Sequence, residues 1–153
     1  MRFALLLCLA TLSAPVASAQ DVADDMIRAT VQNLFDGMRA KDTTAIRATM
    51  HPEARLMTAT TSPAGERVVA ETPMDAFIEA VVNNAVTFDE RLDAEYPVLI
   101  DGPLAVAWTP YHFYAGDQFS HCGTNAFTLA EVDAGWQIVQ IVDTRRREGC
   151  TPE

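Results

Sequence analysis

Side chains able to move protons or to donate hydrogen bonds are concentrated in the C-terminal third of the chain. Carboxylate and imidazole groups can act as general acids or bases near neutral pH. Neutral donors such as phenol and amide groups can stabilise a developing oxyanion. Asp143 and His121 are the candidate catalytic residues. The candidate ligand-binding residues are Trp108, His112, Tyr114, Asn125 and Arg145.

The strands that must position these side chains are joined by short hairpin turns. We expect strands at residues 103 to 115, 118 to 132 and 136 to 145. The Gly-Asp turn at 116 to 117 predicts a register in which His112 faces His121. In the same register Trp108 faces Asn125, so all four side chains would lie on one face of the hairpin.

A three-residue turn at 133 to 135 predicts the second register. It pairs Val132 with Trp136, so that Asn125 faces Asp143. Because side chains alternate along a strand, the two registers collect an apolar half and a polar half on one face. This composition is typical of a small-molecule pocket, and a small-molecule ligand is therefore the expected partner.

The opposite face of these strands is predicted to carry its own apolar group, formed by Trp136, Ile138 and Val142. Large apolar surfaces seldom face water in monomers. This face therefore predicts a homodimer interface rather than a ligand site.

The rest of the chain predicts helices followed by a sheet. Apolar residues recur at helical spacing over residues 24 to 40, Asp42 can cap a second helix over 43 to 50, and Thr72 can cap a third that ends near 84. The remaining strands are expected at 54 to 61, 66 to 71 and 86 to 100. This order predicts a single α+β domain whose sheet buries one face against the helices.

The first 19 residues have the features of a secretory signal peptide. A basic residue precedes the apolar run at 3 to 12, and the small residues at 17 to 19 form the expected cleavage site before Gln20. The apolar run is shorter than the roughly 20 residues that cross a bilayer. We therefore expect a soluble periplasmic or secreted domain over residues 20 to 153, with no membrane insertion after cleavage.

Charge and cysteine content indicate which partners are disfavoured and whether a disulfide is expected. The 153 residues include 11 Lys plus Arg and 21 Asp plus Glu, a formal net charge of −10, which disfavours nucleic acid as a partner. After removal of the signal, two cysteines remain, Cys122 and Cys150. Because oxidising compartments form and keep disulfides, we expect these two to be bonded.

The predicted element order, together with Gly135-Trp136-Gln137-Ile138-Val139 in the last strand, resembles the nuclear transport factor 2-like superfamily, which includes the SnoaL-like polyketide cyclases. The likeness covers about Asp24 to Asp143 and extends to exported bacterial members, through the segments at 121 to 127 and 143 to 146. It implies a cone-shaped fold with N-terminal helices packed on a strongly curved antiparallel sheet and a pocket between them. Members are commonly homodimers, and their activities differ widely.

The resemblance implies that Asp143 could abstract a proton next to a carbonyl, as buried carboxylates do in the related cyclases and isomerases. We therefore expect a cofactor-independent acid/base enzyme of isomerase, dehydratase or cyclase type, acting on a small, partly apolar substrate. The alternative is a non-catalytic ligand-binding or dimeric accessory module without enzymatic activity.

The candidate residues also have structural interpretations that the sequence leaves open. Asp143 could bond Asn125 or an arginine, the two histidines could satisfy each other, and Trp108 could simply pack in the core. A metal site from His112, His121 and Asp143 would have suitable ligand types. Its spacing matches no recognised signature, so no metal is predicted.

Overall fold

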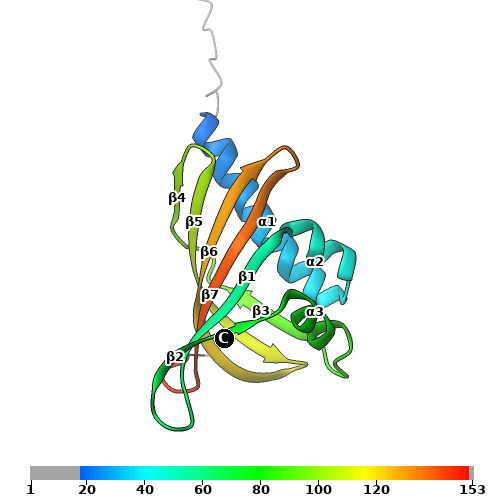
Figure 1. Cartoon of the computed structure of the whole chain (residues 1–153), viewed down its shortest axis with the longest axis vertical. Helices are drawn as coiled ribbons and strands as arrows, with labels where there is room; N and C mark the ends of the chain where they lie inside the picture. Colours follow the sequence, from blue (N-terminus) through cyan, green and yellow to red (C-terminus); the bar gives the residue numbers. More distant parts are fainter. Residues whose placement is uncertain (1–17, 152–153) are drawn as a thin grey trace, which may run out of the picture.

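A computed structural model describes residues 18 to 151, and residues 1 to 17 of the expected signal peptide lie outside this part. The helices are α1 (Ala19–Ala40), α2 (Thr43–Thr49) and α3 (Met74–Val82) (Figure 1). The strands are β1 (Met50–Thr61), β2 (Arg67–Thr72), β3 (Phe88–Leu92), β4 (Val98–Asp101), β5 (Leu104–Ala115), β6 (Gln118–Val132) and β7 (Gly135–Arg146). No helix within the described residues combines the length and apolar character that a membrane crossing needs.

Side-chain caps fix the start of the two N-terminal helices. Ser18 and Asp21 form a reciprocal capping box, which starts α1 earlier than the sequence pattern suggests. Asp42 caps α2 as predicted, because its carboxylate accepts from the backbone amides of Thr44 and Ala45. The buried stripe of α1 contains the expected residues Ile27, Val31, Leu34, Phe35 and Met38.

The third helix starts differently from the prediction. Thr72 was expected as its N-cap, but Thr72 is the last residue of β2 and pairs with Leu56 of β1. Pro73 takes the N-cap position, and no side chain caps α3. Thr72 has the extended backbone that a residue before proline prefers, and it uses this conformation to pair with β1.

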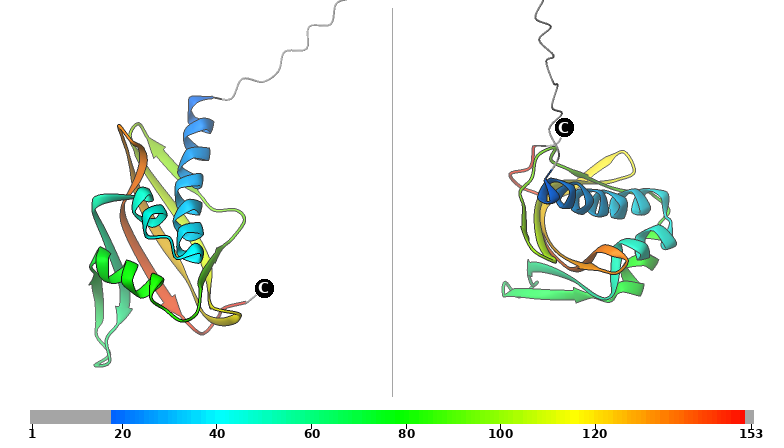
Figure 2. Two further views of the ribbon diagram at one scale, coloured as in Figure 1. Left: turned by 90° about the vertical axis from the view of Figure 1, so that its right-hand side faces the viewer. Right: turned by 90° about the horizontal axis from the view of Figure 1, so that it is seen from above.

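The sheet has seven strands, in the order β2-β1-β7-β6-β5-β3, with β4 also paired to β5. The sheet curves around α1, as the right-hand view of Figure 2 shows. The α+β cone predicted from the sequence is therefore confirmed. One detail differs from an antiparallel sheet, because β1 runs parallel to β7.

The strand predicted over residues 86 to 100 is two separate strands. Both β3 and β4 pair with β5, at different ends of that long strand. The break between them ends at Pro97, which has no N–H to donate to the ladder. Before this break β3 pairs with the C-terminal half of β5, where Phe88 and Glu90 line the cavity.

The predicted register of the first hairpin is wrong beyond its turn. Tyr114 pairs with Phe119 as predicted, but the next pair is Phe113 with His121, which leaves Ser120 as an extra residue in β6. Such a β-bulge reverses the alternation of faces. Residues of β5 before the bulge therefore have inward and outward sides opposite to those predicted from the sequence.

The second predicted register is recovered by a second irregularity. Val132 pairs with Gly135, so the turn has two residues rather than three. A bulge at Val139 then shifts the ladder by one residue, and Asn125 faces Asp143 as predicted. The face that carries Asp143 is therefore the one expected from the sequence.

The bulge at Val139 also shows that most of the predicted dimer patch was wrong. Trp136 and Ile138 were expected on the outer face, but they are 5% and 0% exposed and belong to the core. Because Val139 is an extra residue, Trp136 and Ile138 share the inner face with Ile141. Of the predicted patch, only Val142 keeps an outward position in the alternation.

The predicted disulfide between Cys122 and Cys150 is confirmed, with their Cα atoms 5.8 Å apart. Cys122 alternates with the inward-facing His121 and Gly123, so it lies on the outer face of β6. The bond therefore ties the segment after β7 back to the outside of the sheet.

Candidate functional site

A cavity of about 340 Å³ lies between the inner face of the sheet and helices α1 and α3. Most of its wall is apolar, with Phe35, Met38, Phe77, Val81, Phe88, Phe113, Phe127 and Ile141 among the lining residues. The polar lining residues are Thr58, Thr72, Glu90, Tyr111, His121, Asn125, Asp143 and Arg145. Apolar walls with a few convergent polar groups are the usual composition of a small-molecule site.

Glu90 is an acidic lining residue that the sequence prediction missed, as it also missed the lining residues Thr58, Thr72 and Tyr111. It lies in the middle of β3 opposite Phe113, and its Oε1 accepts a hydrogen bond of 2.7 Å from Nδ2 of Asn125. Burial raises the pKa of Glu90 to about 7, against the hydrogen bond from Asn125, which lowers it, while the nearby charge of Asp143 raises it further. Glu90 can therefore both accept and release a proton near neutral pH.

Asp143 lies deep in the same cavity in a different environment. Its residue is 8% exposed, and its Oδ2 accepts from Nε of Arg145 at 2.7 Å and from the Tyr111 hydroxyl at 3.4 Å. Its Oδ1 is buried and has no hydrogen-bond partner among the described residues. The guanidinium of Arg145 thus balances this carboxylate, whereas Glu90 has only the amide of Asn125.

Gly123 allows Tyr111 to reach this cluster. Gly123 is paired with Tyr111, and a Cβ atom on Gly123 would lie 2.7 Å from the Tyr111 hydroxyl and would also collide with the Thr144 carbonyl oxygen. The Tyr111 hydroxyl instead donates to that carbonyl oxygen at 3.0 Å. Burial raises the pKa of Tyr111, so the phenol remains a hydrogen-bond donor.

His121 lines the cavity next to these groups. Its ring stacks on Phe113 with centroids 4.7 Å apart and meets the edge of Tyr111 at 5.8 Å. Its Nδ1 lies 3.1 Å from the Ser120 hydroxyl. Burial and the charge of Arg145 lower the pKa of His121, which keeps the imidazole neutral at pH 7.

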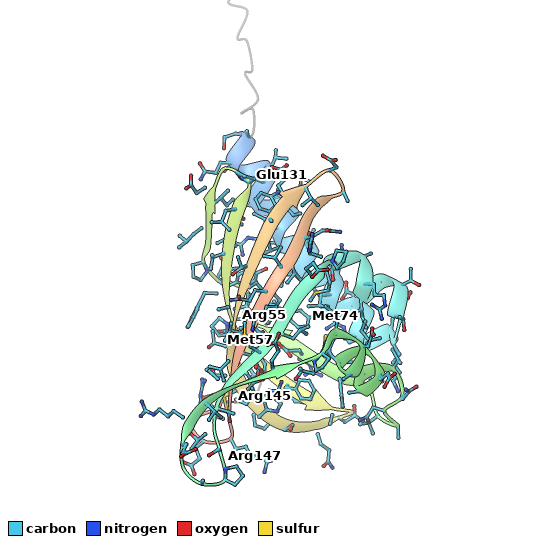
Figure 3. The ribbon with its side chains drawn as sticks, viewed as in Figure 1. Arg55, Met57, Met74, Glu131, Arg145 and Arg147 are labelled. Atoms are coloured by element: carbon cyan, nitrogen blue, oxygen red, sulfur yellow. A yellow bond between two sulfur atoms is a disulfide. The ribbon has the colours of Figure 1, made fainter. Side chains whose placement is uncertain are left out.

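The structure brings together four of the predicted site residues. Asp143, His121, Asn125 and Arg145 all line the cavity. Figure 3 labels Arg145 near the end of β7, below Met57 of β1, which is another lining residue. These four come from β6 and β7, where the predicted register is correct at Asn125.

The three predicted ligand-binding residues from β5 lie outside the cavity lining. Trp108 is 53% exposed, His112 pairs with Cys122 rather than His121, and Tyr114 packs against Arg91, whose guanidinium lies 4.0 Å from the ring centroid. Placing them in the pocket was wrong because the Ser120 bulge puts even-numbered β5 residues on the outer face.

Two further observations concern the sequence predictions. No group of three potential metal ligands comes together within residues 18 to 151.

A signal for Glu90 was present in the sequence, because Phe88, Glu90 and Leu92 alternate on one side of a short strand. A carboxylate between two large apolar residues on one strand face is a candidate buried acid.

The two carboxylates define what the site can do. Glu90 has a pKa near neutral pH, and Asp143 is paired with a guanidinium. Titratable groups whose environments differ in this way are typical of sites that divide acid and base roles. The apolar walls provide room for a small, partly apolar molecule beside them.

This sheet, curved around a helix and enclosing a polar cluster in an apolar cavity, has the α+β fold of nuclear transport factor 2-like proteins. A nuclear transport factor 2-like superfamily protein from Salmonella enterica superposes with a TM-score of 0.67 and 18% identity, covering 88% of this chain and 99% of its own. A protein from Streptomyces avermitilis, described as a putative dehydratase from the NTF2-like family, superposes with a TM-score of 0.65 and 9% identity over 84% and 99%.

A third structure, an NTF2-like protein with a cystatin-like fold from Novosphingobium aromaticivorans, has a TM-score of 0.64 and 14% identity, covering 90% of this chain and 95% of its own. At these identities the likeness shows the fold alone. No curated protein matches the sequence. The chain belongs to the family described as "Putative lumazine-binding", whose sequence profile matches residues 22–142.

Proposed function

We propose that this protein is an exported enzyme that moves protons on a small, partly apolar substrate without a cofactor. Glu90 is the group that takes and returns the proton, Asp143 is its charged partner, and His121 and Asn125 position the reacting molecule. The reaction is of isomerase, dehydratase or cyclase type, in which a proton leaves a carbon next to a carbonyl.

One observation carries this proposal, namely the hydrogen-bonded Glu90 carboxyl group in a largely apolar cavity. Its pKa of about 7 is suited to general acid and base catalysis near neutral pH. The neutral imidazole of His121 can supply a hydrogen bond to an oxyanion nearby. The relative from Streptomyces avermitilis described as a putative dehydratase is consistent with chemistry of this kind.

A substrate-independent assay for a buried base tests the proposal. 5-Nitrobenzisoxazole is flat and uncharged, and a carboxylate that removes its C3 proton breaks the N–O bond to give a coloured cyanonitrophenolate. We expect the wild-type protein to accelerate this elimination, with a rate that rises as pH increases through about 7, where Glu90 loses its proton. Glu90→Gln should lower the rate about 100-fold or more, because a positioned base contributes that much.

The matched control is Glu95→Gln, which removes an exposed carboxylate from the loop before β4 and should leave the rate unchanged. A wild-type rate no faster than free acetate, or an unchanged rate in Glu90→Gln, would rule out Glu90 as the base. The protein would then be a binding module.

Ligand binding without turnover is the second candidate function, and the family supports it. The family description names lumazine binding rather than a reaction. In this case the same cavity would hold a ligand, and Glu90 would set the pH dependence of binding. If the wild-type protein and Glu90→Gln bind a carbonyl compound with equal affinity and neither converts it, this second function is favoured.

Export is supported by the disulfide, because oxidising compartments keep such bonds. Cleavage before Gln20 would remove the Ser18 cap of α1 but none of the buried residues of that helix, the first of which is Ile27. Mass spectrometry of protein from the native host's periplasm and medium should find a chain that begins at Gln20.

A homodimer formed through the outer face of the sheet completes the proposal. Trp108, Leu104 and Leu99 are 53%, 48% and 70% exposed, and Leu99 pairs with Val106 beside them. These four residues, here called the outer patch, lie on one face of β4 and β5. Exposed apolar surfaces of this kind mark protein interfaces.

A further inference from the structure

The buried Oδ1 atom of Asp143 lacks a hydrogen-bond donor. The other carboxylate oxygen, Oδ2, already accepts from Arg145 at 2.7 Å and from Tyr111 at 3.4 Å. Oδ1 has no partner among the described residues, although Asp143 is only 8% exposed. Buried carboxylate oxygens are nearly always paired, because an unsatisfied one loses its hydration without gaining a hydrogen bond in return.

The neighbouring amide does not supply this donor. Asn125 faces Asp143 across the β6–β7 ladder, but its Nδ2 donates to Glu90 at 2.7 Å and to Thr109 at 3.4 Å. Both amide hydrogens therefore have acceptors elsewhere. Asp143 lines the cavity, so a molecule bound there is placed to donate to Oδ1.

Charge and space restrict the kind of donor. Glu90 and Asp143 disfavour an anionic ligand, and Arg145 already offsets the charge of Asp143, which weakens the attraction for a cation. Because Oδ1 is buried, a slender hydroxyl or N–H group can reach it with a smaller rearrangement than a bulky ammonium group. Apolar walls surround the remainder of the ligand.

We infer that Asp143 Oδ1 accepts a hydrogen bond from the ligand, so that the cavity selects uncharged, mainly apolar molecules that carry a hydroxyl or N–H donor. This inference rests on the proposed function only in requiring that the cavity binds a small molecule. It assigns Asp143 the role of a specificity-determining acceptor, distinct from the proton transfer assigned to Glu90.

The hydrogen bonds at Oδ2 predict what Asp143→Asn does. Arg145 Nε is a donor 2.7 Å from Oδ2, so it holds the amide oxygen of the new side chain at the Oδ2 position. The amide NH₂ group then replaces Oδ1. The variant therefore presents a donor to the ligand where the wild-type protein presents an acceptor.

Three naphthalenes of similar size test this change by isothermal titration calorimetry at pH 7. They are 2-naphthol, which is an uncharged donor, 2-methoxynaphthalene, which lacks the donor, and 2-acetylnaphthalene, which carries a carbonyl acceptor. The wild-type protein should bind 2-naphthol at least about tenfold more tightly than 2-methoxynaphthalene. Hydrophobicity alone predicts the opposite order, since the methoxy compound is more apolar.

In Asp143→Asn the preference for 2-naphthol over 2-methoxynaphthalene should disappear, and 2-acetylnaphthalene should become the tightest of the three. Two control variants accompany it. Asp133→Asn removes an exposed carboxylate from the β6–β7 turn and should keep the wild-type order. Ala80→Trp places a large side chain at a lining position of α3 and should weaken binding of all three compounds.

The possible results separate this inference from the proposed function. A wild-type order that follows hydrophobicity, or a preference for 2-naphthol that persists in Asp143→Asn, overturns the inference while the cavity remains a binding site. Binding that Ala80→Trp weakens for all three compounds places them in this cavity. No binding of any compound by the wild-type protein overturns both the inference and the proposed ligand site. The wild-type comparison stands even if Asp143→Asn does not fold.

Discussion

Two carboxylates share one cavity, and their partners distinguish them. Asp143 has a guanidinium within hydrogen-bond distance, whereas Glu90 has the neutral amide of Asn125. A neutral donor stabilises a carboxylate less than a charged one does. Burial therefore outweighs hydrogen bonding at Glu90, and its pKa rises to about 7.

This raised pKa predicts a pH-dependent stability. The folded protein holds the Glu90 proton more tightly than the unfolded chain, whose carboxyl group has the ordinary pKa of 4.5. The contribution is therefore complete below that value and is lost as pH rises towards about 7. The loss amounts to about 3 kcal/mol at most in the free energy of unfolding.

Urea unfolding at about pH 5 and about pH 8 measures this effect as the difference between wild-type protein and Glu90→Gln. Glu90→Gln should gain stability relative to the wild type at the higher pH, because a neutral amide has no charge to bury. Glu95→Gln serves as the exposed control and should follow the wild type. A constant difference between wild type and Glu90→Gln across this range would contradict the raised pKa.

At the scale of the elements, the β-bulges explain which parts of the site could be read from the sequence. Helix caps and turns depend on local residue types, so the Asp42 cap of α2 and the positions of the hairpins were predictable. The facing of Asn125 and Asp143 matches the prediction only because the bulge at Val139 offsets a turn that is one residue shorter than expected. The Ser120 bulge has no comparable signal, because a serine fits a regular strand as well as a bulge. Because the prediction lacked this one extra residue, it placed Trp108 and His112 on the wrong face of the sheet.

Glu90 was missed for a related reason. Pro97 marks a break in the strand predicted over 86 to 100, but the sequence does not show which part of β5 each half pairs with. Only the pairing of β3 with the end of β5 places Glu90 opposite Phe113 and next to Asn125. Contacts between distant strands therefore determine the polar end of the cavity.

The segment after β7 gives a prediction at this scale. The Cys122–Cys150 bond spans 28 residues, and in the chain-entropy model such a bond stabilises the folded state by about 3–4 kcal/mol. Cys150→Ser should therefore lower the thermal unfolding midpoint clearly. A reducing agent should lower the wild-type midpoint to the same value and leave the variant unchanged.

Differential scanning calorimetry with and without reductant checks this prediction. Because Cys122 lies on the outer face of β6, the cavity-lining face need not rearrange when the bond is lost. Binding of 2-naphthol should therefore survive in Cys150→Ser at temperatures where the protein remains folded. A reduced wild-type protein as stable as the oxidised one would show that the bond does not constrain the fold.

At the scale of the whole molecule, the two faces of the sheet have separate roles. The inner face holds the cavity, and the outer patch of Leu99, Leu104, Val106 and Trp108 lies on its reverse. Alternation along β5 places Trp108 directly between the inward-facing Ala107 and Thr109. A change at Trp108 therefore leaves the chemical groups of the cavity untouched.

This separation predicts the behaviour of Trp108→Glu. Size-exclusion chromatography with light scattering should find the wild-type protein at twice the chain mass and Trp108→Glu at the chain mass, because a buried unpaired charge is unfavourable in an interface. Val69→Glu, at a 63% exposed position of β2 away from the outer patch, should remain dimeric. A monomeric wild type, or dissociation of only Val69→Glu, would contradict the proposed interface.

The same variant tests whether assembly and chemistry are independent. The groups that set the pKa of Glu90 are the apolar walls, Asn125, Asp143 and Arg145, all on the inner side of the sheet. A monomeric Trp108→Glu should therefore keep the pH midpoint of the benzisoxazole elimination near 7, even if its thermal unfolding midpoint falls. A shifted pH midpoint in the monomer would mean that the partner subunit shapes the cavity through the sheet, and the site would then belong to the dimer.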